Sequence, residues 1–374
     1  MSANLLFLAL LTACSTEPEP AAPPTGGATH APGAPGAGPG AGMPGGQPAG
    51  PPPEGGLDAG ELAERANALF QPLPEWMGDR ANEATVALGR QLYYEKRLSK
   101  NHDISCNSCH QLDRFGVDGE PTSPGHKGQR GGRNSPTSLN AALHVAQFWD
   151  GRAATVEDQA KGPILNPIEM ALPDEATAVA NITSIPGYPP LFEAAFGDDA
   201  VTYDRIADAI GAFERGLVSP SPFDKMLAGE LTALNHQQLK GLETFMDVGC
   251  TACHNGVGVG GAGYFKLGLV TPYETADNGR HDLTGAEADK HVFKAPSLRN
   301  ITKTGPYLHD GSVGSLDEVV KIMGRHQLGK ELDASQTGHL IQFLDALTGV
   351  VPAAYVKAPE TLPSGPTTPA ADPS

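Results

Sequence analysis

Four of the five cysteines occur in two short motifs of the same type, each followed directly by a histidine. The residues are Cys106, Cys109 and His110 in the first motif, and Cys250, Cys253 and His254 in the second. The pattern C-x-x-C-H attaches a c-type haem: two thiols add to the two vinyl groups of one porphyrin, and the adjacent imidazole becomes the proximal iron ligand. The sequence therefore predicts two covalently bound haem c groups.

Two other sites can be built from paired cysteines. One is a zinc site that uses all four thiols, and the other is a pair of thioredoxin-like redox sites. Zinc does not require a histidine directly after both pairs. The repeated histidine therefore favours haem.

The composition of the chain limits its class. A length of 374 residues suggests two domains. Acidic residues outnumber basic ones by 43 to 26, and the net charge of −17 argues against nucleic acid and for a small basic protein partner. Five cysteines exclude a disulfide-dense scaffold. No apolar run reaches the roughly 18 residues that a membrane helix needs.

Both ends of the chain differ in composition from its middle. Between residues 15 and 56, Pro, Gly and Ala make up 32 of 42 residues, which predicts a disordered tether because little there can be buried. Residues 350–374 are rich in proline and are also predicted to be disordered. The remaining chain divides into two expected haem domains, an N-terminal one over 57–221 and a C-terminal one over 222–349.

Residues 1–14 look like a bacterial lipoprotein signal. A short apolar stretch ends in Leu-Thr-Ala-Cys, and lipidation of Cys14 would hold the protein at a membrane. The segment before the apolar stretch departs from this pattern because it carries no Lys or Arg. A plain secretory signal with an incidental cysteine is the alternative. We expect a lipid anchor on the periplasmic side of a bacterial membrane, and Ser15 after the cysteine favours the outer membrane.

Helical periodicity surrounds both motifs, whereas strand-like alternation is scarce. Apolar residues recur at helical spacing before each motif and again near the end of the folded region. Ser315 is placed to cap a helix that carries Leu316, Val319, Val320 and Met323 on one face. The predicted fold is mainly α, with two cytochrome-c-like helical domains that each hold one covalent c-type haem.

The chain resembles the bacterial di-haem cytochrome c peroxidases over most of its folded part. The matching blocks, in the family order, are RNSPTSLNAALHVAQFWDGRA (133–153), AKGPILNPIEM (160–170), GCTACHNG (249–256), APSLRNI (295–301), GPYLHDGSV (305–313) and IMGRHQLG (322–329). The resemblance implies reduction of hydrogen peroxide to water with electrons from a small cytochrome c or a copper protein (cupredoxin). It also suggests a homodimer, because the family is commonly dimeric.

The resemblance also implies the ligands of both irons. His110 and His126 match the proximal and distal ligands of the N-terminal haem, where peroxide reacts after His126 is displaced. His254 and Met323 match the ligands of the C-terminal haem, which accepts electrons. Since a Met ligand raises the potential relative to a second His, the C-terminal haem is expected to have the higher potential. From the sequence alone, His126 could equally be an exposed loop residue, and Met323 could be a core residue.

Further roles follow from the same resemblance. Glu169 matches the distal carboxylate, the candidate acid–base group for cleaving the O–O bond. Trp149 matches an indole between the haems that assists electron transfer. Asn134, Thr304 and Pro306 match a calcium site at the domain interface, with a side-chain oxygen from the asparagine and backbone carbonyls from the other two. His309 matches a position near the second haem but receives no ligand role.

Three functions are consistent with two haems. The first is a peroxidase, and the second is a non-catalytic electron carrier with two six-coordinate irons. The third is oxidation of a partner protein, as in a related group of di-haem proteins. Glu169 favours the peroxidase because a carrier does not need a distal carboxylate. Met323 argues against the third function, since that group has a tyrosine at the corresponding position.

Overall fold

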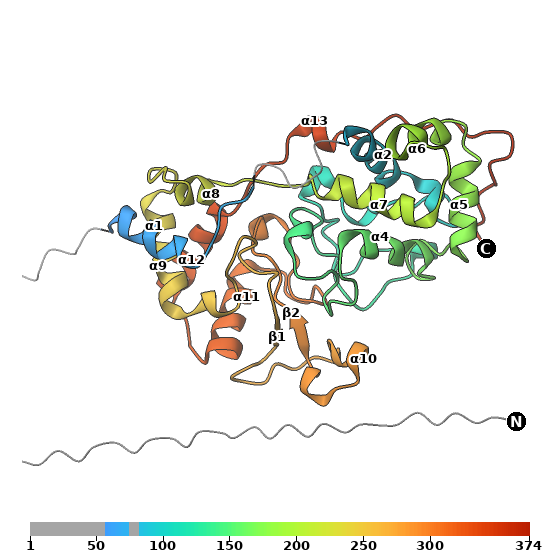
Figure 1. The fold of residues 1–374 in the computed structure, drawn as a ribbon. Coiled ribbons are helices and arrows are strands. Elements are labelled where there is room, and N and C mark those ends of the chain that lie inside the picture. Colours follow the sequence, from blue (N-terminus) through green and yellow to red (C-terminus); the bar gives the residue numbers. More distant parts are fainter. Residues whose placement is uncertain (1–56, 75–81) are drawn as a thin grey trace, which may run out of the picture. The chain divides into compact units, whose positions relative to one another are not determined.

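The computed structural model describes residues 57–74 and 82–374, which belong to one compact unit, Gly55–Ser374 (Figure 1). The predicted signal (1–14) and tether (15–56) lie outside the described residues. Within the described part of the chain, no helix is long and apolar enough to cross a membrane.

The fold is mainly α, as predicted, and it contains two hydrophobic cores. The first core is built from the helices that surround the first C-x-x-C-H motif. These helices are α2 (Glu83–Tyr93), α3 (Cys106–Cys109), α4 (Val156–Leu165), α5 (Glu175–Thr183), α6 (Tyr188–Phe196) and α7 (Tyr203–Glu214). Helix α7 packs against both α2 and α4.

The second core surrounds the second motif. Its helices are α1 (Ala59–Asn67), α8 (Pro222–Leu227), α9 (His236–Val248), α11 (Leu316–Ile322) and α12 (Ala334–Ala346). The second half of the chain also contains α10 (His281–Thr284), a π-helical turn (Met323–Gln327) and the antiparallel strands β1 (Tyr264–Lys266) and β2 (Val292–Lys294), which lie outside this core. Helix α1 packs on α8 and α9, so its residues belong to the second core. The expected N-terminal domain, 57–221, therefore begins too early.

The main helix pair of each core crosses at a glycine. A Cβ on Gly89 of α2 would lie 1.8 Å from the Ala209 carbonyl oxygen of α7. A Cβ on Gly241 of α9 would lie 2.0 Å from the His339 carbonyl oxygen of α12. Because no side chain fits at either crossing, glycine lets the two helices of each pair approach closely. The two cores thus repeat one packing arrangement.

A shared hydrogen-bond junction joins the two cores. Asn140 and Asn300 both have left-handed backbones, and each donates its side-chain amide to Ser219 Oγ at 2.8 Å. The amide oxygen of Asn140 accepts from Ser219 N, and that of Asn300 accepts from Gly349 N. All three side chains are buried. The junction therefore fixes the two loops that follow Pro136 and Pro296.

The C-terminal tail was predicted to be disordered, and that prediction is wrong. In Figure 1 the tail, coloured red, runs along α2, α6 and α5, and it includes the short helix α13 (Ala353–Val356). Tyr355 stacks on Phe213 at 5.1 Å, and Tyr94 donates a hydrogen bond to the Val356 carbonyl. Leu362 also packs on the first core. The few apolar residues among the prolines are thus sufficient to hold the tail on the surface.

Candidate functional site

The first C-x-x-C-H motif forms a single helical turn. Ser105 and Ser108 make a capping box that starts α3, and the His110 amide donates to the Cys106 carbonyl at 3.0 Å. His110 Nδ1 lies 2.9 Å from the Pro136 carbonyl oxygen. Because this acceptor holds the proton on Nδ1, Nε2 is free to bind iron. The pKa of His110 is lowered by burial.

The second motif repeats this arrangement. The His254 amide donates to the Cys250 carbonyl at 3.0 Å. Burial lowers the pKa of His254 to about 4, and the Pro296 and Val259 carbonyls oppose that fall. Nδ1 is buried without a hydrogen bond of standard geometry. Pro136 and Pro296 therefore occupy equivalent positions beside His110 and His254.

The four motif cysteines form no disulfide and are partly buried. Burial raises the pKa of Cys109 to about 11 and that of Cys250 to about 12. Over the described residues, no three His, Cys, Asp or Glu side chains are grouped to hold a metal ion. The two pairs therefore do not form the alternative four-cysteine zinc site. Their thiols and adjacent imidazoles fit the attachment of two haems.

His126 and Glu169 lie side by side although 43 residues separate them. The His126 amide lies 3.0 Å from the Ile168 carbonyl oxygen and 2.8 Å from that of Glu169. A Cβ on Gly125 would lie 2.0 Å from the Ile168 carbonyl, so only glycine permits this approach. His126 is buried, with 6% of its surface exposed, which excludes the exposed-loop interpretation.

The Glu169 carboxylate lies close to the first motif. Burial raises its pKa, whereas the Arg152 charge and a hydrogen bond from Asn166 lower it. Glu169 also interacts electrostatically with Cys109, whose pKa it raises. A partly desolvated carboxylate beside a haem attachment site is suited to move protons.

A cavity with mainly apolar walls borders the second motif. Cys250, Cys253, His254 and Met323 all line it, as do Leu316, Val319 and Val320 of α11. Ser315 caps α11 by accepting from the Glu318 amide, as predicted. Met323 begins the π-helical turn, a local widening of the helix that is common at functional sites. The predicted face of α11 therefore points at the site where the second haem is expected.

Trp149 and the predicted calcium ligands line the same cavity. Trp149 Nε1 donates to the Asn134 carbonyl at 2.9 Å. The side-chain nitrogen of Asn134 donates to the Glu120 and Pro121 carbonyls, which leaves Oδ1 to serve as a ligand. Thr304 and Pro306 belong to the second half of the chain, after the second motif, whereas Asn134 belongs to the first half. These oxygen donors suit a hard cation.

His309 also lines this cavity and has partners of its own. Its Nε2 lies 3.0 Å from Thr275 Oγ1, and its ring stacks on Phe293 at 4.3 Å. The repeat Trp149-Asp150-Gly151 and His309-Asp310-Gly311 places His309 where the first half of the chain has its tryptophan. Each tripeptide lies within a loop closed by an antiparallel bridge, Gln147 to Ala153 and Tyr307 to Val313.

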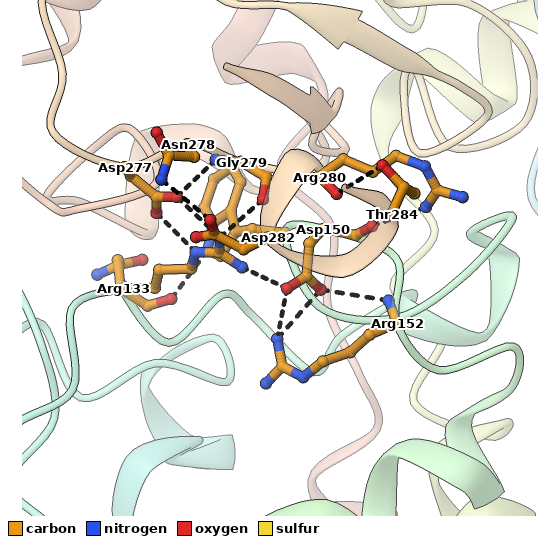
Figure 2. Close-up of polar contacts among 11 residues, drawn as sticks. Arg133, Asp150, Arg152, Asp277, Asn278, Gly279, Arg280, Asp282 and Thr284 are labelled. Carbon is orange, nitrogen blue, oxygen red and sulfur yellow. Dashed lines mark hydrogen bonds and ion pairs between the residues drawn. The ribbon is translucent and has the colours of Figure 1, made fainter. Parts of the chain in front are cut away.

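Sequence reasoning did not find the charged cluster that joins the two halves of the chain. Figure 2 shows Arg133 between Asp277 and Asp150, with distances of 2.7 and 2.8 Å to Asp277 and 2.6 Å to Asp150. Arg152, which faces Glu169, also donates to Asp150. Arg133 directly precedes Asn134, so the cluster holds a predicted calcium ligand in place. The one feature of the sequence that points to the cluster is that Arg133 and Asn134 are adjacent.

Comparisons with known proteins give a consistent result. The family model for di-haem cytochrome c peroxidase matches residues 83–232. The cytochrome c551 peroxidase of Nitrosomonas europaea is 46% identical over 84% of this chain and 93% of its own length. That of Pseudomonas aeruginosa is 44% identical over 79% of this chain and 88% of its own length. A solved structure of a MauG-like protein associated with microbial copper homeostasis is 30% identical, with a TM-score of 0.68, and covers 77% of this chain and 97% of that one.

Proposed function

The chain belongs to the di-haem cytochrome c peroxidase family, and from this premise we propose how its residues divide the work of a peroxidase. The enzyme is a cytochrome c peroxidase. The reaction takes one hydrogen peroxide, two electrons and two protons to two waters.

The first motif holds the haem at which peroxide reacts. Cys106, Cys109 and His110 bind this group, which supplies the redox chemistry of iron when bound. His126 would also hold this group in the oxidised protein, and it would have to move away before peroxide could enter. Glu169 then transfers a proton from one peroxide oxygen to the other. The contact between the His126 amide and the Glu169 carbonyl supports this proposal, because movement of one affects the other.

The second motif holds the haem that accepts electrons. Cys250, Cys253 and His254 would bind it, and Met323 would hold it as a further ligand. The shared cavity lining of these four residues supports this assignment. The donor is a small cytochrome c or a cupredoxin. A net charge of −17 favours a donor with a basic docking face, since opposite charges speed association.

Trp149 lies on the route between the two sites. Its indole bonds to Asn134 of the first half, and its carbonyl accepts from the Lys294 amide of the second half at 2.8 Å. A calcium ion held by Asn134, Thr304 and Pro306 would fix the position of Trp149, because its ligands come from both halves of the chain. The ion would then organise the electron route without taking part in the chemistry.

The observation that carries the proposal is the difference between the two sites. Glu169 and Arg152 accompany the first motif, whereas an apolar helix face and Met323 accompany the second. A carrier would not need this carboxylate, and a protein-oxidising relative has tyrosine at the Met323 position.

Steady-state turnover tests the proposal. Purified protein with two haems, verified by mass spectrometry, is mixed with reduced cytochrome c and peroxide, before and after partial reduction. Oxidation of the cytochrome in proportion to peroxide supports the proposed division of roles. No turnover in either state would reject the peroxidase function.

We also propose that Cys14 carries a lipid anchor on the periplasmic side of a bacterial membrane. Labelling of cells with a fatty-acid probe tests it. The Cys14→Ser variant should lose the label and leave the membrane fraction, and a label that persists contradicts the anchor.

A further inference from the structure

A buried lysine lies in the cavity of the second motif. Lys294, the last residue of β2, is 6% exposed and lines this cavity with Cys253, His254 and Met323. Among the described lining residues it is the one cationic Lys or Arg side chain, and no Asp or Glu lines the cavity. Lys294 forms no ion pair in the described part of the chain. A buried ammonium group without a counter-ion is costly.

The partner of Lys294 fixes the direction of a second donor. Lys294 Nζ lies 2.8 Å from His144 Nδ1. Since an ammonium group only donates, Nδ1 must accept, and the proton of the neutral imidazole then resides on Nε2. His144 Nε2 is buried and has no hydrogen-bond partner in the described structure, although His144 lines the same cavity. The pair therefore offers two sets of unused donors: N–H groups of the ammonium and Nε2–H of the imidazole.

The protonation state agrees with this geometry. Burial lowers the pKa of Lys294 to about 8, so the lysine is mostly charged at neutral pH. Burial and the Lys294 charge lower the pKa of His144 well below its usual range, so the imidazole is neutral.

The backbone holds the pair in position. The Lys294 amide donates to the Trp149 carbonyl at 2.8 Å, and β2 pairs Lys294 with Tyr264 of β1. A Cβ on Gly261 would lie 2.3 Å from the His144 ring, so the chain packs closely around the imidazole. The donors are therefore preorganised for an anion that the chain itself does not provide.

A haem c group brings two propionate carboxylates to an otherwise apolar site. From this charge balance we propose that Lys294 and His144 form the binding site for a propionate of the second haem. The proposal rests on the proposed attachment of that haem to Cys250 and Cys253. The site would neutralise a carboxylate close to the iron and join it, through the Lys294 backbone, to Trp149.

The test is a redox titration of the holoprotein at pH 7, where Lys294 is mostly charged, with two haems per chain verified by mass spectrometry. In Lys294→Met the propionate charge is left uncompensated, which disfavours addition of an electron to the second haem. We expect the reduction equilibrium constant of that haem to fall at least tenfold, about 59 mV for one electron. Lys294→Arg should recover part of this change.

Lys266→Met is the matched control, since Lys266 is an exposed residue of the paired strand β1. In Lys266→Met, the reduction equilibrium constant of the second haem should change less than twofold. A change of less than twofold in Lys294→Met overturns the proposal, as does a change confined to the first haem, which would assign the lysine to a different propionate. A change that depends on added chloride or acetate would mean that a free anion occupies the site, and this also overturns it.

A second variant covers failure of Lys294→Met to fold or to take up haem. His144→Phe removes the imidazole Nε2–H donor and the Nδ1 acceptor of Lys294, keeps the lysine charge, and should lower the reduction equilibrium constant of the second haem as Lys294→Met does, but by less. In the unmodified protein, the propionate-bending band of the second haem in the resonance Raman spectrum should shift in D2O, because exchangeable N–H groups bind the carboxylate. An unshifted band contradicts the proposal. Wild-type protein without a second haem would instead refute the proposed function.

Discussion

Glu169→Gln separates proton transfer from the rest of the first site. Glutamine keeps the volume of the side chain, and its Oε1 can still accept the hydrogen bond that Asn166 gives to the carboxylate. Arg152, whose side chain is exposed, keeps Asp150 as a partner at 3.0 and 3.1 Å, so its charge still has a counter-ion. The main loss is the proton acceptor. General acid–base catalysis contributes about 10² to 10⁴ in rate, or about 2.7–5.4 kcal/mol.

We therefore expect kcat/KM for peroxide to fall by about 10² to 10⁴, with both haem spectra and the melting temperature unchanged. Steady-state oxidation of reduced cytochrome c measures the fall. Glu193→Gln is the matched control, because Glu193 occupies an exposed position of α6, a helix that packs on the same core. This variant should have full activity. If Glu169→Gln retains more than about a tenth of wild-type kcat/KM, the reasoning about the proton shuttle is refuted.

Three further predictions concern the tail, an acid-sensitive ion pair and calcium. Tyr355→Ala removes the ring stacked on Phe213 and should lower the free energy of unfolding by about 2 kcal/mol in calorimetry; an unchanged value contradicts the ordered tail. Burial raises the pKa of Glu95, but Arg97 holds it below its ordinary value of 4.5. The stability advantage of wild type over Glu95→Gln should thus be full at neutral pH and disappear as the pH falls through the folded pKa; a pH-independent difference contradicts it. Asn134→Ala should weaken calcium binding by about tenfold or more in a chelator titration, whereas wild-type affinity would remove Asn134 from the site.

The sequence was most informative where function restricts residue type and spacing together. The two C-x-x-C-H motifs, the helix capped at Ser315 and the mainly α fold are local patterns, and the structure has both the helix and the fold. The proximity of His126 to Glu169 could not be derived from spacing, because it depends on a close approach at Gly125 that links distant loops. Resemblance to the family provided both residues, and their roles stay predictions.

The failures have a physical cause in common. The tail was judged by its average composition, whereas a few residues such as Tyr355 and Leu362 determine whether it packs. His144 received no role from the sequence, and its partner Lys294 follows two apolar residues in a short strand. Buried polar pairs are tertiary features, since neither residue shows its partner in the sequence. The one available signal was a lysine directly after the two apolar residues of β2.

A redox titration followed by electron paramagnetic resonance tests the central claim most directly, namely that the two haems have different ligands and different tasks. For fully oxidised protein with both haems attached, we predict two distinct ferric signals. The His254/Met323 signal should disappear first as the potential falls, and the remaining signal should then change as His126 leaves the first iron. Two signals that are identical, or that disappear together without any change in the first site, would contradict the account.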